Sequence, residues 1–294
     1  MQPSISRLRA RTAEAAGNAA IGSAIAPLSA GRPWRQRLDP MPVLGVMATI
    51  GLWYLASWLI GRYMPPPHEV FANAARNLVA SDYFVGLGLP EGGYLPHLLY
   101  TSMTVVLGVA MGVGLGCLTG LLSARWRVFD QITDPIVATF GTVPILVAAP
   151  FFLIWFGLVA SAQLILVAFY TTVIMHIYSL QAVRNLHPKY VEFARTLGAS
   201  SGAIFLRVVL PGAVPEIFGG VRVAFAASWG LAAIAELLGS RYGVGYAILT
   251  FESVYDLASI MTIILLLGLI ALAMDWLIGR ARAWITRWAE SAAA

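Results

Sequence analysis

Charged residues are scarce in this chain. Asp, Glu, Lys and Arg make up 11% of its 294 residues and hydrophobic residues 59%, and the mean hydropathy is +0.77. Soluble domains carry about a quarter charged residues, so this composition excludes an ordinary soluble domain and predicts several membrane-spanning segments. Cysteine is almost absent as well. Cys117 is the single one, so no intrachain disulfide can form, and we interpret it as a small packing residue.

Sequence motifs for catalysis and nucleotide binding are also missing. The four histidines (His68, His97, His176 and His187) form no H-E-x-x-H pair, and no nucleophile with a matching base is evident. The phosphate-binding pattern G-x-x-x-x-G-K-[ST] is absent. We therefore expect no catalytic site, no metal site and no cofactor bound by this chain. An intramembrane enzyme is kept only as an alternative class.

Six apolar segments are long enough to cross a membrane, which takes about 20 residues of helix. Pro144 and Pro150 interrupt the third segment, which a span tolerates where neighbours or a cavity satisfy the freed carbonyls. We predict an all-α polytopic membrane protein with one transmembrane domain over 41–285, a basic tail over 1–40 and a short tail over 286–294. The expected spans are 42–61, 98–122, 135–157, 161–183, 213–238 and 258–279.

Basic residues are distributed unevenly between the two sides that these spans create. Fifteen of the 19 Lys and Arg fall in the N-terminal tail, in loops over 123–134 and 184–212, or after the sixth span. The positive-inside rule then places both termini in the cytoplasm. Topology accounts for the basic charge, so we expect no nucleic-acid partner. A cleaved signal peptide is the competing interpretation of the tail, since "IGSAIAPLSA" is weakly apolar.

The polar segment over 190–217 interrupts the apolar pattern on the predicted cytoplasmic side. Pro188 suits the first turn of a helix, and we expect Glu192 in that same turn, where the helix dipole favours an acid. Gly198 is placed to end this helix with a left-handed residue. The segment over 186–211 is thus predicted to begin as a short helix with defined ends.

A second short helix is expected directly after this bend. Ser200 or Ser201 can cap its start, and Pro211 would stop it. Small or apolar groups such as Ala194, Leu197 and Ala199 would then be exposed beside charges. Apolar groups exposed on a rigid element favour a docking site for another protein. A helix that merely lies on the membrane surface is the alternative.

The spacing within this loop resembles the EAA loop of ABC importer permeases. The sequence has EFA at 192–194, three residues, Gly198, nine residues and VVLP at 208–211. The family pattern is Glu-Ala-Ala, three residues, Gly, nine residues, Ile, any residue, Leu-Pro. Phe193 and Val208 depart from it mildly. The resemblance implies a type I ABC importer permease fold with six spans.

Further stretches extend the resemblance to the nitrate/sulfonate/taurine subfamily over roughly 41–285. They are "VPILVAAPFFLIWFG", "LGAS", "VLPGAVPEI", "GGVR", "SWG" and "AELLGSRYGVGYAI". Taurine and aliphatic-sulfonate permeases are the most similar group. The sequence departs from it in "FGTVPILVAAP" and by an insertion around 82–94, within a glycine-rich piece that we expect to be irregular.

The resemblance implies a membrane complex in the bacterial inner membrane. Two copies of this permease would pair with two cytoplasmic ATPase subunits, which use ATP and Mg²⁺, and a periplasmic binding protein would deliver the solute. Taurine or another alkyl sulfonate is favoured; nitrate, bicarbonate, an aromatic acid or a vitamin precursor stay open, as does a stand-alone secondary transporter or channel. The implied ATPase-coupling residues are Glu192, Phe193, Ala194, Leu197, Gly198, Ala199 and Ser200.

Charged residues inside spans are costly and therefore indicate function or structural pairing. We expect Arg222 either to face a cavity, where its guanidinium suits a sulfonate head group, or to pair with an acid on another helix such as Asp275. A purely structural ion pair is the competing interpretation. Further pathway or gate candidates are Ser228, Trp229, Glu236 and Pro144.

Glycine recurs every four residues in the second span, at Gly108, Gly112, Gly116 and Gly120. This spacing places the glycines on one helical face and permits close backbone contact with another helix. The contact is expected within the subunit, with the interface to a second permease as the alternative.

Overall fold

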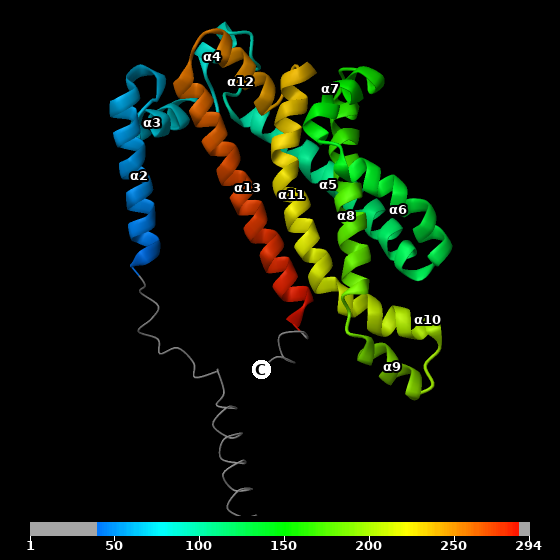
Figure 1. Ribbon diagram of the computed structural model, residues 1–294. Helices are drawn as coiled ribbons and strands as arrows, with labels where there is room; N and C mark the ends of the chain where they lie inside the picture. The colour runs from blue at the N-terminus through cyan, green and yellow to red at the C-terminus, as the bar shows by residue number, and fades with distance from the viewer. Residues whose placement is uncertain (1–39, 288–294) are drawn as a thin grey trace, which may run out of the picture.

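The computed structural model describes residues 40–287, and every regular element in that range is a helix (Figure 1). The all-α prediction is confirmed for this part of the chain. The tails predicted over 1–40 and 286–294 lie almost wholly outside the described residues. The helices are α2 (Met41–Ile60), α3 (Pro67–Asn77), α4 (Asp82–Gly86), α5 (Leu95–Arg125), α6 (Arg127–Thr142), α7 (Ile145–Phe156), α8 (Ala160–Arg184), α9 (Pro188–Thr196), α10 (Ser201–Ile204), α11 (Leu210–Gly239), α12 (Val244–Ser253) and α13 (Leu257–Ile285).

Five uninterrupted helical segments are long and apolar enough to cross a membrane, and α6 with α7 forms a bent sixth candidate. The long helices run between two ends of the bundle. In Figure 1 the upper end carries α3, α4 and α12, and the lower end carries α9 and α10. The five or six candidate spans agree with the predicted polytopic fold.

The third predicted span, 135–157, is not one straight helix. α6 and α7 meet at an angle of 104°. Val143 between them has extended dihedrals, φ −75° and ψ 122°, because a residue that precedes proline is pushed out of the helical region. Pro144 therefore breaks the span, whereas Pro150 lies inside α7 without ending it.

The loop expected over 123–134 is almost entirely helical. α5 continues to Arg125 and α6 begins at Arg127, with Trp126 as the single extended residue between them. The two helices are tied together by the hydroxyl groups of Ser123 and Thr133, 2.8 Å apart. Polar residues at the end of a helix do not by themselves end it, which is why this boundary was misplaced.

The glycine face of α5 packs against α8 within the same subunit. A Cβ atom on Gly112 would lie 2.6 Å from the carbonyl oxygen of Ala168 and still closer to Thr171. Gly108, Gly116 and Gly120 would meet α8 in the same way, and all four glycines are buried. The two backbones approach too closely for any side chain, so this face is not available to a second permease.

Two apolar cores hold the bundle together. The first joins α5, α7, α8 and α11 around Phe225 and Trp229. The second lies at the upper end, where the ring of Phe84 stands 4.8 Å from that of Tyr94 and 5.0 Å from that of Phe251. Burial there raises the pKa of Tyr94 to about 12. The upper end is thus a packed cap and not a set of loose loops.

The connections at the upper end contain more helix than predicted. Besides α3, the piece expected to be irregular contains α4, whose start is capped by the Ser81 hydroxyl accepting a hydrogen bond from Phe84 N at 3.3 Å. α12, which was not predicted from the sequence, occupies most of the connection between α11 and α13. These helices bury the aromatic residues of the upper core.

α2 stands at one side of the bundle and has no buried residue (Figure 1). Its contacts with the rest of the described chain are concentrated at its upper end. Trp53 Nε1 donates to the carbonyl oxygen of Pro65 at 3.0 Å, and the rings of Tyr54 and His68 stack with centroids 6.0 Å apart. α2 is therefore attached through α3 instead of by packing along its length.

Candidate functional site

α9 begins as the sequence predicted. Pro188 occupies its first turn, and His187 caps it, with Nδ1 accepting a hydrogen bond from Lys189 N at 3.3 Å. Glu192 does not lie in that first turn, which contains no acid. The prediction for Glu192 was wrong because the helix starts at Pro188, so Glu192 falls in the second turn, where the helix dipole contributes little.

α9 ends at Gly198 in a left-handed conformation, φ +76°. The N–H of Gly198 donates to the carbonyl oxygen of Arg195 at 2.9 Å, and that of Ala199 donates to Ala194 at 3.2 Å. These two hydrogen bonds form a Schellman motif, which satisfies carbonyls at the helix end. The bend is therefore a defined structure that holds α9 at a fixed angle.

The second half of the loop differs from the prediction. Ser200 caps α10, with its hydroxyl accepting from Ala203 N at 3.3 Å. Pro211, however, does not stop the helix, because a π-helical turn over Phe205–Val209 leads directly into α11. The wider turn lies just before Pro211, which has no N–H to donate. Figure 1 shows α10 running sideways from the foot of α11, so the chain bends there without breaking.

One face of α9 exposes large apolar side chains. Tyr190, Phe193 and Leu197 are 62%, 66% and 71% exposed. Their spacing of three and then four residues puts them on one side of the helix. We call them the α9 apolar face. Tyr190 was not among the predicted coupling residues, although its spacing from Phe193 and Leu197 was a signal for it.

The other predicted coupling residues surround this face. Glu192, Gly198 and Ser200 are exposed. Ala194 and Ala199, expected to be exposed, are half-buried instead. The exposed apolar surface of α9 is therefore aromatic and branched aliphatic.

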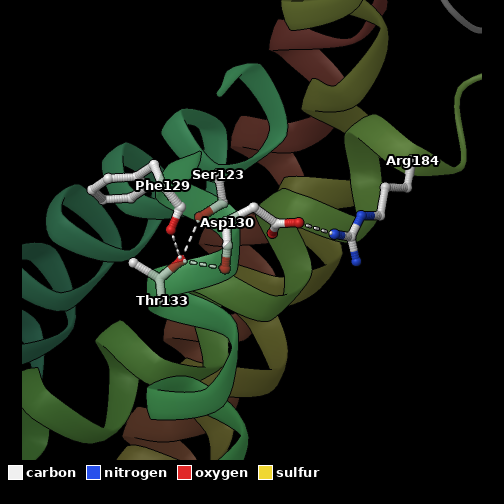
Figure 2. Close-up of polar contacts among 5 residues, drawn as sticks. All are labelled: Ser123, Phe129, Asp130, Thr133 and Arg184. Atoms are coloured by element: carbon white, nitrogen blue, oxygen red, sulfur yellow. Dashed lines mark hydrogen bonds and ion pairs between the residues drawn. The ribbon is translucent and has the colours of Figure 1, made fainter. Parts of the chain in front are cut away.

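Polar contacts attach the base of this loop to the bundle. Figure 2 shows Arg184, the last residue of α8, pointing to Asp130 on α6, with Nη2 and Oδ2 2.8 Å apart. The next residue, Asn185, donates from Nδ2 to Glu216 Oε1 on α11 at 2.7 Å. The two residues Arg184 and Asn185, which lie just before α9, are thus bonded to α6 and α11.

Arg222 and Asp275 form an ion pair between α11 and α13. Nε of Arg222 lies 2.8 Å from Oδ1 and Nη2 lies 2.5 Å from Oδ2, so both carboxylate oxygens are engaged. The side chains keep exposures of 44% and 39%. The pairing considered from the sequence therefore exists, and the pair lies at the surface of the subunit.

Three of the four further pathway candidates face the interior of the subunit. Ser228 is fully buried and donates to the carbonyl oxygen of Ala224 at 2.7 Å. Trp229 is 5% exposed within the first core, and Glu236 is 1% exposed. Pro144, in contrast, is exposed at the break between α6 and α7. The sequence did not show which side of α11 is turned toward α5 and α8.

Glu236 holds the upper end of α11 to α5 and α12. Its carboxylate accepts hydrogen bonds from Thr101 Oγ1 at 2.8 Å and from Gly245 N at 2.9 Å. The same hydroxyl oxygen accepts from Val244 N at 2.9 Å. Thr101 was missed because it lies 135 residues from its partner and no local pattern marks it.

The geometry defines a class of protein. Within residues 40–287, no group of three or more His, Cys, Asp and Glu could hold a metal ion. The described chain is a polytopic helical bundle with a broken span and a rigid, capped loop that exposes apolar side chains at one end. These features define a polytopic membrane protein with a candidate docking loop at one end.

Comparison with known proteins identifies the family. The chain belongs to the binding-protein-dependent transport system inner membrane components, whose sequence pattern matches residues 112–290. It is the permease subunit of an ABC importer. SsuC of Escherichia coli (strain K12), described as an aliphatic sulfonates transport permease, is 31% identical over 83% of this chain and 89% of its own length.

Two other relatives are less similar. The taurine transport permease TauC of E. coli (strain K12) is 25% identical over 73% of this chain and 78% of its own length. The bicarbonate transport permease CmpB of Synechococcus elongatus (strain ATCC 33912 / PCC 7942 / FACHB-805) is also 25% identical, over 87% and 92% of the two chains. The predicted membership in the nitrate/sulfonate/taurine group of importer permeases is confirmed.

A solved structure shares the fold. A chain of the inward-facing MetNI methionine ABC transporter aligns with a TM-score of 0.56 and 18% identity, over 70% of this chain and 99% of its own. The predicted type I importer permease fold is therefore confirmed.

Proposed function

We propose that this permease translocates a small organic anion, with taurine or another alkyl sulfonate as the favoured solute. Relatives named for aliphatic sulfonates and taurine support this choice. The relative named for bicarbonate is also named for an anion, so bicarbonate is the alternative solute. The protein lies in the bacterial inner membrane with its lower end in the cytoplasm, as the distribution of basic residues predicts.

The observation that supports ATPase coupling is the α9 apolar face. Exposed aromatic and aliphatic side chains on a capped helix suit insertion into a groove of a partner protein. In this proposal α9 and its C-terminal bend, with Glu192, Phe193, Leu197 and Gly198, seat on a separate ATPase subunit. A helix held at both ends passes a displacement on, whereas a flexible loop would absorb it.

The complete transporter contains two copies of this permease, two ATPase subunits and a periplasmic binding protein that docks at the upper end. ATP and Mg²⁺ are bound by the ATPases and not by this chain, which lacks the phosphate-binding loop. Closure of the ATPases around ATP would move α9 and open the path outward, and hydrolysis would reset it.

The test is uptake of radiolabelled taurine by liposomes that contain the permease, its ATPase and its binding protein. A Phe193→Ser, Leu197→Ser double variant is expected to lose both ATPase co-purification and ATP-dependent uptake. Val79→Ser is the matched control, because Val79 is 65% exposed at the upper end, away from α9. Wild-type uptake by the double variant would refute the docking role. Uptake by wild type without ATP would instead indicate a stand-alone transporter.

The ion pair between Arg222 and Asp275 has two roles to distinguish. If Arg222 contacts the solute, Arg222→Gln lowers taurine uptake, and the Arg222→Gln, Asp275→Asn double variant, in which Asp275 carries no unpaired charge, lowers it as well. If the pair is structural, the double variant recovers the uptake that Arg222→Gln loses. ATPase co-purification verifies that each variant assembles.

A further inference from the structure

A cavity of about 720 Å³ opens at the upper end of the bundle. It lies between the N-terminal parts of α5 and α8 and the connection that follows α11. None of the proposed coupling or pathway residues lines it. Its walls include Tyr100, Val159, Gln163, Ser240, Arg241 and Tyr242.

Gln163 is the buried polar group of this cavity. Its side chain is 1% exposed, and Oε1 accepts a hydrogen bond from the hydroxyl of Tyr100 at 3.0 Å. Its amide nitrogen has no hydrogen-bond partner among residues 40–287. This nitrogen is not one of the enclosed unpaired atoms of the described chain, and Gln163 lines the cavity, so its two N–H groups are available to an acceptor there.

Arg241 supplies the positive charge. It is exposed and forms no ion pair or hydrogen bond with the described residues. No Asp or Glu among the described residues lines the cavity. Glu236 belongs to the same end of α11, but its carboxylate is held by Thr101 and Gly245 in the interior. The guanidinium is therefore available to a ligand.

The N-terminus of α8 is the third feature of the cavity, after Gln163 and Arg241, that favours a negatively charged ligand. Val159 precedes the 25-residue helix, makes no side-chain cap and lines the cavity together with Ala160. The first N–H groups of a helix lack intrahelical acceptors, and the helix dipole makes this end positive. The rings of Tyr100 and Tyr242 also line the cavity, with centroids 6.0 Å apart, and they offer apolar surface beside the charge.

We propose that this cavity binds the anionic head group of a small solute, a sulfonate or a carboxylate, as the solute leaves the binding protein. Arg241 and the Gln163 amide bind the oxygens, and the tyrosine rings cover the alkyl part. The inference rests on the proposed function for the identity of the solute, and it adds a capture site at the mouth of the path.

Anion binding is measured directly on the assembled permease–ATPase complex in lipid nanodiscs, without the binding protein. Saturation-transfer NMR with butanesulfonate as the probe, and 1-butanol as its neutral counterpart, detects weak binding. Because charge-assisted hydrogen bonds are the strong ones, Arg241→Gln is expected to weaken butanesulfonate binding about 10-fold or more. Gln163→Leu is expected to weaken it about 5-fold, with 1-butanol unaffected by either change.

Arg62→Gln is the control, since Arg62 is exposed at the same end of the bundle but does not line the cavity. It should bind butanesulfonate as wild type does. Wild-type binding by Arg241→Gln, or an equal loss in Arg62→Gln, would overturn the proposal. ATPase co-purification checks that each variant assembles.

Two further measurements distinguish a solute site from a docking site for the binding protein. If Arg241→Gln weakens docking of the unliganded binding protein and leaves butanesulfonate binding unchanged, the cavity receives an acidic side chain of the partner and the proposal fails. If the wild-type complex binds butanesulfonate through Arg241 but transports no sulfonate, the capture site stands and the proposed solute is wrong.

Discussion

Gly112 lies at a close contact between α5 and α8, and replacing it by alanine tests how rigid that contact is. The added Cβ would lie 2.6 Å from the carbonyl oxygen of Ala168 and closer still to Thr171. Neither neighbour is the flexible end of a long side chain, so the two helices must separate. The contact is deep inside the subunit, where little else can adjust.

Gly114, two residues further along α5, provides the matched control. A Cβ atom there meets nothing within 4 Å. Both changes gain up to about 1 kcal/mol of helix propensity, so this gain cancels in the comparison. Overpacking a well-packed interior costs typically about 1–3 kcal/mol. Gly112→Ala is therefore expected to be less stable than Gly114→Ala by about 1–3 kcal/mol.

The assay is SDS-induced unfolding of the purified permease in mixed micelles, followed by far-ultraviolet circular dichroism. Gly112→Ala should unfold at a lower SDS mole fraction than wild type, and Gly114→Ala at the same or a higher one. If Gly112→Ala matches or exceeds Gly114→Ala in stability, α5 and α8 are not in the close contact described, and the reasoning is wrong.

Two further predictions concern a backbone turn and a buried hydroxyl. Gly198→Ala places a side chain at φ +76° with no neighbouring atom within 4 Å, so backbone strain alone should cost about 1–2 kcal/mol and loosen α9. Stimulation of the ATPase by the binding protein should therefore fall. Gly202→Ala is the control, because Gly202 has equal space and an ordinary helical backbone, and it should leave this stimulation unchanged. Thr101→Val removes a donor to Glu236 and should lower unfolding stability by about 1–3 kcal/mol. Thr104→Val should have a smaller effect in the same SDS titration, since that hydroxyl bonds only within its own helix.

The sequence was most informative where local chemistry decides the structure. Long apolar runs located the membrane helices, because spanning the hydrocarbon core leaves few alternatives. Pro188, Gly198 and Ser200 predicted the start, the bend and the second helix of the loop. Each acts through its own backbone or through a neighbour within a few residues, which a sequence shows directly.

The sequence was less informative where contacts between distant segments determine the local structure or the direction in which a residue faces. Ser228, Trp229 and Glu236 were interpreted as pathway residues, and the sequence did not show that all three are buried in the interior of the subunit. In a membrane helix the core side and the lipid side are both apolar, so hydrophobic periodicity does not distinguish them.

The effect of a proline also depends on its surroundings. Pro144 broke a helix that was expected to continue, while the π-helical turn before Pro211 let a helix continue that was expected to stop.

α11 connects the two ends of the molecule, since it continues from the π-helical turn below and leads into Ser240 and Arg241 above. Its 30 residues span about 45 Å, so a rocking of about 5° about its centre moves each end by about 2 Å, in opposite directions. A shift of that size exceeds the tolerance of a hydrogen bond. A solute held at the upper cavity and a nucleotide held by the partner would then be thermodynamically linked, each altering the affinity for the other by the same factor.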